Sequence, residues 1–154
     1  MRSKLTFTLL LIAAGALSAC ASGRFDSENP DCPDVAQLHA AHLYGSWNVE
    51  LPQAGLRGTL TLRQHPEFAA SLRGEFRYGG QQSIASGDVE GGEFNLDESR
   101  DGKTLFAFWS GRLVPAACGA EIRGTWQPLA PEGRPAAESD FILRRTQSTG
   151  SRAW

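Results

Sequence analysis

The chain has 154 residues, of which 41% are hydrophobic and 21% charged, and its formal net charge is −2. This length suits one domain. The charge balance argues against a nucleic-acid partner, because binding to a phosphate backbone requires clustered lysines and arginines.

The first residues have the pattern of a secretory signal. Arg2 and Lys4 open the chain, and a largely apolar run follows from Leu5 through Leu17. A membrane-spanning helix is the alternative, but the run is shorter than the roughly 20 apolar residues needed to cross a bilayer. We therefore expect residues 1–19 to be a signal peptide.

The apolar run ends in Leu17-Ser18-Ala19-Cys20. These four residues resemble the lipobox of bacterial lipoproteins. The resemblance implies cleavage before Cys20, modification of Cys20 by acyl chains such as palmitate, and stable anchoring in a membrane. Ala21 stands where an aspartate commonly means inner-membrane retention, so the expected place is the periplasmic face of the outer membrane. The alternative is an ordinary signal peptide and a freely soluble protein.

The mature chain is expected to begin with a lipidated tether over residues 20–31. Residues 21–31 are polar and reach at most about 36 Å when extended. Loss of Arg2 and Lys4 from the 15 basic side chains leaves 13 against 17 acidic ones, which favours solubility. With Cys20 modified, Cys32 and Cys118 are the two remaining thiols in an oxidising compartment, which predicts a disulfide between them.

Residues 33–43 are expected to form one short helix, because Val35, Leu38 and Leu43 have near-helical spacing after Pro33. Beyond this segment, apolar and polar residues alternate, as is typical of half-buried strands. The strands are predicted at residues 44–51, 56–64, 70–78, 81–90, 92–98, 104–114, 118–127 and 138–145.

The connections between these strands predict an antiparallel meander. Residues 52–55, 79–80, 91–92 and 101–102 contain the glycine, proline and aspartate that tight turns need. In six strands a glycine lies two residues from an apolar residue on each side, which turns it to the apolar face. Inward glycines relieve crowding inside a small barrel. We therefore expect an all-β domain over residues 32–145, an eight-stranded up-and-down barrel plugged at one end by the helix, followed by a tail over residues 146–154.

A short helix followed by Gly45-x-Trp47 on the first of eight strands resembles the lipocalin and avidin group of barrels, the calycins. In lipocalins an arginine late on the last strand lies across that tryptophan. The resemblance implies a structural latch between Trp47 and Arg145, with Arg144 as the second candidate. No match to the polar biotin-binding residues of avidin follows Trp47.

The sequence contains no motif for nucleophilic catalysis and no complete set of metal ligands. His39 and His42 could touch one metal ion but lack a third ligand. Six acids surround the fifth strand without the spacing of a calcium loop, and we expect them to be outward-facing charges. They are Asp88, Glu90, Glu93, Asp97, Glu98 and Asp101. No enzymatic activity, cofactor or metal is predicted.

Aromatic residues are the main candidates for binding, because several share the predicted inward face. They could line a cavity for an apolar ligand, or they could fill the barrel and leave no pocket. The candidate ligand residues are Trp47, Phe76, Tyr78, Trp109 and Trp126, and Phe94 shares their face. On the sixth strand, Phe106 and Phe108 would be exposed unless a partner or another segment covers them.

These patterns favour a non-enzymatic, membrane-anchored lipoprotein that binds a small apolar ligand in the mouth of its barrel. The alternative is a protein-binding module of the cell envelope, such as an inhibitor of a protease or lysozyme, or an assembly accessory. Some bacterial protease inhibitors are similar to this chain in having eight-stranded, disulfide-bonded barrels with a Gly-x-Trp start.

Overall fold

The structure is a computed structural model that describes residues 31–130 and 137–146. The expected signal peptide, Cys20 and nearly all of the tether and tail lie outside the described residues. Among the described residues, no helix has the length and apolar character needed to cross a membrane.

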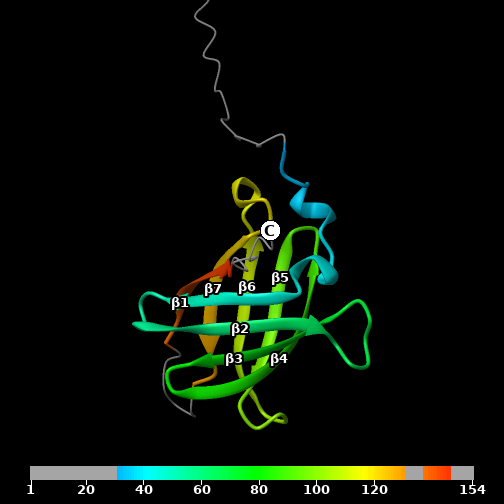
Figure 1. Cartoon of the computed structure of the whole chain (residues 1–154). Coiled ribbons are helices and arrows are strands. Elements are labelled where there is room, and N and C mark those ends of the chain that lie inside the picture. The colour runs from blue at the N-terminus through cyan, green and yellow to red at the C-terminus, as the bar shows by residue number, and fades with distance from the viewer. Residues whose placement is uncertain (1–30, 131–136, 147–154) are drawn as a thin grey trace, which may run out of the picture.

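Eight antiparallel strands close into one barrel, which confirms the predicted fold class (Figure 1). Each strand pairs with the next along the chain, and β1 also pairs with β8, so that Trp47 lies opposite Arg145 and Val49 opposite Leu143. The observed bounds lie within three residues of the predicted ones. The strands are β1 Gly45–Leu51, β2 Leu56–Gln64, β3 Leu72–Tyr78, β4 Gln81–Glu90, β5 Glu93–Ser99, β6 Leu105–Leu113, β7 Glu121–Pro128 and β8 Ser139–Arg145.

The prediction of one helix over residues 33–43 is wrong. This segment forms two 3₁₀ turns, η1 Val35–Gln37 and η2 Ala40–Leu43, separated by an extended backbone at Leu38. Leu38, Ala40 and Leu43 are all buried. A continuous α-helix would turn Leu38 and Ala40 to nearly opposite sides, and the break lets both reach the barrel.

Inward glycines allow neighbouring strands to approach closely, as the sequence pattern predicts. Gly111 of β6 lies opposite Gly124 of β7. A Cβ on Gly111 would lie 2.5 Å from the Arg123 carbonyl oxygen and 2.7 Å from Cζ of Phe141. Any side chain at this position would therefore push β7 and Phe141 away from β6.

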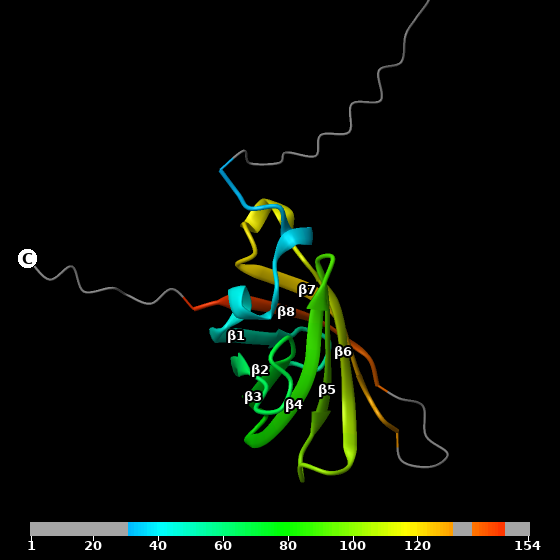
Figure 2. The ribbon, with the colours of Figure 1, turned by 90° about the vertical axis from the view of Figure 1, so that its right-hand side faces the viewer.

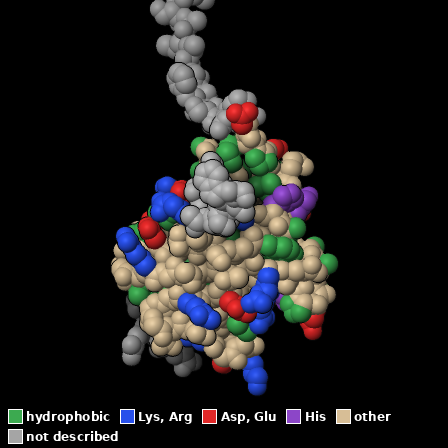
Figure 3. Space-filling view, in the orientation of Figure 1, with side chains coloured by type: hydrophobic (Ala, Val, Ile, Leu, Met, Phe, Trp, Pro, Cys, Tyr) green, Lys and Arg blue, Asp and Glu red, His purple; other side chains and the backbone are tan. Residues whose placement is uncertain are grey.

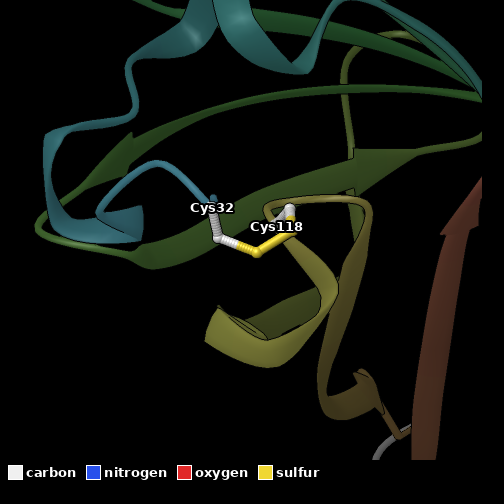
Figure 4. The surroundings of a disulfide bond; sticks show 2 residues. All are labelled: Cys32 and Cys118. Atoms are coloured by element: carbon white, nitrogen blue, oxygen red, sulfur yellow. A yellow bond between two sulfur atoms is a disulfide. The ribbon is translucent and has the colours of Figure 1, made fainter. Parts of the chain in front are cut away.

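The predicted disulfide is present. It joins Cys32, before η1, to Cys118, which follows a third 3₁₀ turn, η3 Pro115–Ala117 (Figure 4). The two Cα atoms are 4.7 Å apart, although 86 residues separate them in sequence. Because η3 occupies residues 115–117, β7 begins three residues later than predicted.

The barrel has two different ends. We call the end that carries η1, η2, η3, loop 65–71 and turn 91–92 the closed end. We call the end formed by turns 52–55 and 79–80 and loop 100–104 the mouth. Figures 1 and 2 show the N-terminal segment and the η3 loop together at the closed end, and the β5–β6 loop far from them. In Figure 3 hydrophobic side chains gather near the N-terminal segment, while charges of both signs are spread over this face.

Candidate functional site

A buried carboxylate lies near the mouth of an otherwise apolar barrel. Glu98 is the second-last residue of β5 and alternates with Phe94 and Leu96 on the inward face, where its residue is only 1% exposed. The prediction that all six acids around this strand face outward is therefore wrong for Glu98. The other five are exposed: Asp88, Glu90, Glu93, Asp97 and Asp101.

Three side-chain donors from three other strands converge on this carboxylate. The Tyr78 hydroxyl lies 2.8 Å from both Glu98 oxygens and shares its one proton between them, and Trp109 Nε1 donates to Oε2, also at 2.8 Å. Ser83 Oγ donates to Oε1. Hydrogen bonds to an ionised acceptor are the strong ones, so they offset part of the cost of burying the charge. We call these four residues the mouth network.

Small neighbours on both sides of Glu98 leave space for its side chain. Ala85 of β4 and Ala107 of β6 lie opposite Glu98 in the strand register, and both are buried. The register of β5 and β6 shifts between Glu98 and Ser99. Irregularities of this kind bend a strand and re-aim its side chains, here at Phe106, which the register leaves without a partner on β5.

Burial raises the pKa of Tyr78 well above its ordinary value, and the neighbouring Glu98 carboxylate raises it further. The phenol therefore stays protonated and remains a hydrogen-bond donor at physiological pH. Within residues 31–130 and 137–146, no lysine or arginine forms an ion pair with Glu98. The positive charge of Arg100 opposes this rise in the pKa of Tyr78.

Above the mouth network, aromatic rings and one arginine form the rim. The Trp126 ring centroid lies 6.4 Å from those of Tyr78 and Phe106. The Arg100 guanidinium carbon lies 3.6 Å from the Phe106 ring centroid. Trp126 Nε1 is buried and makes no hydrogen bond of ordinary geometry in the described part of the chain, although a weak interaction with the Tyr78 hydroxyl lowers the pKa of Tyr78 slightly. A buried donor without a partner costs about 1–3 kcal/mol, so this atom requires an explanation.

Loop 100–104 places Arg100 and is held by Asp101. The Asp101 carboxylate accepts from the backbone N–H groups of Thr104 and Lys103 and from the hydroxyls of Thr104 and Ser99. These hydrogen bonds, led by that from the Thr104 backbone, hold the pKa of Asp101 well below its usual range. Beside this loop lies a groove of about 420 Å³ over β3 and β4, lined by Arg77, Ile84 and Arg100 among others.

A second set of polar contacts closes the mouth between β1 and β8. The amide of Gln53 donates to Asp140 at 2.7 Å and accepts from Ser139 Oγ and from the Asp140 backbone N–H, both at 2.8 Å. The three polar or charged residues buried in the described chain, Ser83, Glu98 and Ser139, all belong to strand segments that end at the mouth.

Four of the five predicted ligand residues lie together. Phe76 stacks on Trp109 with centroids 4.5 Å apart, Tyr78 meets Trp109 edge to face at 6.0 Å, and Trp126 lies 6.3 Å from Trp109. These rings are buried and pack on one another, and Phe141 and Phe94 extend the cluster. Side chains therefore fill the middle of the barrel.

The fifth predicted ligand residue, Trp47, lies near the closed end. Its Nε1 donates to the Leu43 carbonyl at 2.9 Å, and the Arg145 guanidinium carbon lies 4.7 Å from its ring centroid. Arg145 also donates to the carbonyls of Tyr44, at 3.0 Å, and His42. The latch predicted from the lipocalin resemblance is confirmed for Arg145, whereas Arg144 points to Glu121 and Glu50.

Phe106 and Phe108 are both half-buried. Phe106 packs against the core and lies under Arg100, so part of the expected exposure is covered by the chain itself. Phe108 lies opposite Asp97 and Gln127 on the outer face. His39 and His42 cap η2, where His42 Nδ1 accepts from the His39 backbone at 3.0 Å. No group of three potential metal ligands occurs within the described ranges.

Sequence reasoning missed Glu98, Ser83 and Arg100 as members of the site. The alternation of Phe94, Leu96 and Glu98 was sufficient to place Glu98 inward, but its charge argued for the surface. Ser83 and Arg100 carried no signal of their own, because strand register and loop geometry bring them to the mouth.

Comparisons with family models, curated proteins and solved structures found no match to this chain.

Proposed function

We propose that this chain is a lipid-anchored lipoprotein of the periplasmic face of the outer membrane whose barrel binds a small ligand at its mouth. Binding is proposed rather than catalysis because Glu98, the acid of the site, is buried and accepts hydrogen bonds on both oxygens. It is not placed to exchange a proton with a substrate.

The observation that carries the proposal is the buried Trp126 Nε1 next to the mouth network, which interacts weakly with the Tyr78 hydroxyl but forms no hydrogen bond of ordinary geometry with a described residue. Natural proteins leave few buried donors unpaired, and a ligand or an ordered water commonly supplies the partner. A few convergent polar groups on an aromatic surface are typical of small-molecule sites. Because the middle of the barrel is filled, the ligand is proposed to stand over the mouth network.

Mass spectrometry of small molecules that co-purify with the full chain tests this proposal. We expect a bound compound that Trp126→Phe reduces, since phenylalanine keeps an aromatic surface but has no N–H. Phe68→Ser is the matched control, because Phe68 lies in loop 65–71 at the closed end and is 60% exposed. The proposal fails if the two variants retain equal amounts or if no compound accompanies the natural chain.

The lipid anchor rests on the lipobox resemblance at Cys20. We expect the purified protein to carry an N-terminal mass addition equal to its acyl chains, and Cys20→Ala to abolish both this addition and sedimentation with membranes. Intact-mass measurement and fractionation check the two effects. A mature chain that begins at another residue, or carries no lipid, would contradict the anchor and leave the mouth site unaffected.

Protein binding remains the second candidate, favoured by the filled core, which makes the barrel a rigid scaffold. The half-buried Phe106 and Phe108 on β6 are the proposed contact. Capture of one defined envelope protease or lysozyme by the natural chain, lost in a Phe106→Ser, Phe108→Ser variant, would favour this function. Equal capture by both chains would exclude these two residues as the contact.

A further inference from the structure

The groove of about 420 Å³ lies on the outside of the barrel. Its floor is the outer face of β3 and β4, where Arg77 lies opposite Gln82 in the strand register and Ile84 follows two residues later. Loop 100–104 folds over this face, because a Cβ on Gly102 would lie only 3.3 Å from Cδ1 of Ile84. The groove therefore has a wall that comes from beyond β5, and its volume lies within the range of small-molecule sites.

Asp101 lines the groove but is committed to its own loop. Its carboxylate accepts from the Ser99 hydroxyl, from the backbone N–H groups of Lys103 and Thr104, and from the Thr104 hydroxyl, at 2.7–3.0 Å. A carboxylate has about four lone-pair sites, and these four separate donors fill them. The same hydrogen bonds hold the loop in one shape, so the wall of the groove is preorganised.

The second acid of the groove, Glu75, is drawn away from it. Glu75 forms an ion pair with Arg63 at 2.5 Å. Arg63 belongs to β2, which pairs with β3 on the side opposite to β4. The Glu75 carboxylate is therefore turned toward β2, and a positive charge balances it outside the groove.

The two basic residues of the groove remain available. Arg77 and Arg100 are exposed, and neither forms an ion pair in the part of the chain that the structure describes. The Arg100 guanidinium carbon lies 3.6 Å from the Phe106 ring centroid. Stacking on a ring face leaves the N–H donors at the edge of the guanidinium plane free. The unused hydrogen-bonding capacity of the groove is therefore cationic, and the Gln82 amide adds further donors.

We propose that this groove binds a soluble phosphate ester, whose oxygens accept from Arg77 on one side and from Arg100 on the other. The arginine fork matches phosphate geometry, and a phosphate group presents three strong acceptor oxygens in different directions. A carboxylate has only two oxygens, which lie in one plane. The proposal does not depend on the ligand at the mouth, because Tyr78 and Trp126 are not among the described residues that line the groove.

The position of the groove favours an ester that is free in solution over a lipid headgroup. Loop 100–104 lies at the mouth, whereas Cys32 and the N-terminal segment lie at the closed end (Figures 1 and 2). A membrane that held the chain by its N-terminal segment would therefore meet the other end of the barrel.

Three small probes separate charge from shape: methyl phosphate, its neutral analogue trimethyl phosphate, and acetate, which is charged but planar. Each is titrated at constant ionic strength, which fixes charge screening. The ¹⁵N-labelled full chain in uncharged maltoside micelles is followed by NMR at the backbone N–H signals of Gln82 and Gly102. We expect methyl phosphate to shift both signals and to bind most tightly, acetate to bind more weakly, and trimethyl phosphate to cause no shift.

Arginine variants test the assignment of the two donors. We expect Arg77→Gln and Arg100→Gln each to weaken methyl phosphate binding on the order of tenfold, because each removes charged hydrogen bonds. Arg57→Gln is the matched control. Arg57 is an exposed arginine on β2 without an ion pair in the described chain, and it does not line the groove. Its affinity should equal that of the natural chain.

Four outcomes overturn the proposal. Acetate or trimethyl phosphate that binds as tightly as methyl phosphate would exclude phosphate recognition, and the absence of any shift would exclude the site. Equal weakening by Arg57→Gln and Arg77→Gln would show a diffuse attraction of anions to the surface. Binding of dihexanoyl-phosphatidate far more tightly than methyl phosphate would identify a lipid headgroup as the ligand in place of a soluble ester.

Discussion

At the residue scale, Glu98 is the point on which the hydrogen bonds of the mouth converge. Moving an ionised carboxylate out of water costs several kcal/mol, which hydrogen bonds must offset. Tyr78, Ser83 and Trp109 supply them, and each of these donors would itself be unpaired without Glu98. The four residues are therefore interdependent, although they come from four different strands.

We expect Glu98→Ala to destabilise the fold by about 2–5 kcal/mol, because three buried donors lose their acceptor. Chemical unfolding measures the loss. Glu93→Gln, on the same strand, is the control: Glu93 forms an exposed ion pair with Arg112, which contributes no more than about 1 kcal/mol. Equal losses in the two variants would show that the mouth network does not stabilise the barrel.

The raised pKa of Tyr78, caused first by burial and then by Glu98, predicts a dependence on pH. The folded protein holds this proton more tightly than the unfolded chain does. The contribution to stability is therefore complete below the ordinary tyrosine pKa of about 10 and is lost as the pH rises above it. Urea unfolding between pH 8 and 11 should show a steeper fall for the natural chain than for Tyr78→Phe. Parallel curves would exclude this linkage.

At the scale of elements, closure of the barrel depends on the pairing of β8 with β1. Arg145 stabilises this pairing at the closed end, because it contacts the Trp47 ring and donates to the carbonyls of Tyr44 and His42. Gln53 stabilises the same pairing at the mouth through hydrogen bonds with Ser139 and Asp140. Partial burial lowers the pKa of Arg145, but an arginine stays charged at neutral pH.

We expect Arg145→Gln to cost about 2–3 kcal/mol of unfolding free energy, because it removes a cation–π contact and two charged hydrogen bonds. Arg144→Gln is the neighbouring control, whose loss should stay near 1 kcal/mol, since the Arg144 side chain is 45% exposed. Thermal unfolding of both variants compares them. A larger loss for Arg144→Gln would reverse the assignment of the latch.

The elements also differ in how well local pattern predicted them. β2 and β4 have the predicted bounds, because strict alternation and glycine turns define both ends. The helix prediction over residues 33–43 failed because packing against the closed end of the barrel positions the apolar residues of this segment, and contacts within a helix do not. Asp34 caps η1 through the Ala36 N–H, and the backbone then turns extended at Leu38. Tertiary burial decided this segment.

At the scale of the whole molecule, the disulfide ties the N-terminal segment to the η3 loop across the closed end (Figure 4). Its 86-residue separation means that the cross-link restricts a large part of the unfolded chain. Every strand of the closed barrel is hydrogen-bonded to two neighbours, so the disulfide adds stability to a fold that is already closed by strand pairing.

We expect the Cys32→Ser, Cys118→Ser double variant to lose about 2–5 kcal/mol of stability. Chemical unfolding measures the loss, and the natural chain in a reducing agent should reproduce it. The double variant in the same reducing agent is the control and should not change further. Unfolding at the same denaturant concentration in all four conditions would show that the cross-link does not stabilise the fold.

The sequence by itself determined the barrel, its strand order, its inward glycines and the cysteine pair. Local alternation and turn residues predict the strands, their order and the inward glycines, because these features depend on neighbouring residues. The cysteine pair follows from the number of thiols that remain once Cys20 is assigned to the lipid anchor. Only the tertiary structure decided that the barrel is filled, that Trp47 belongs to the latch, and that Glu98 is buried with Tyr78, Ser83 and Trp109. Those facts depend on which side chains face one another across a closed barrel. Strand register and side-chain volume determine these contacts, and they join residues that are far apart in the sequence, so local patterns do not predict them.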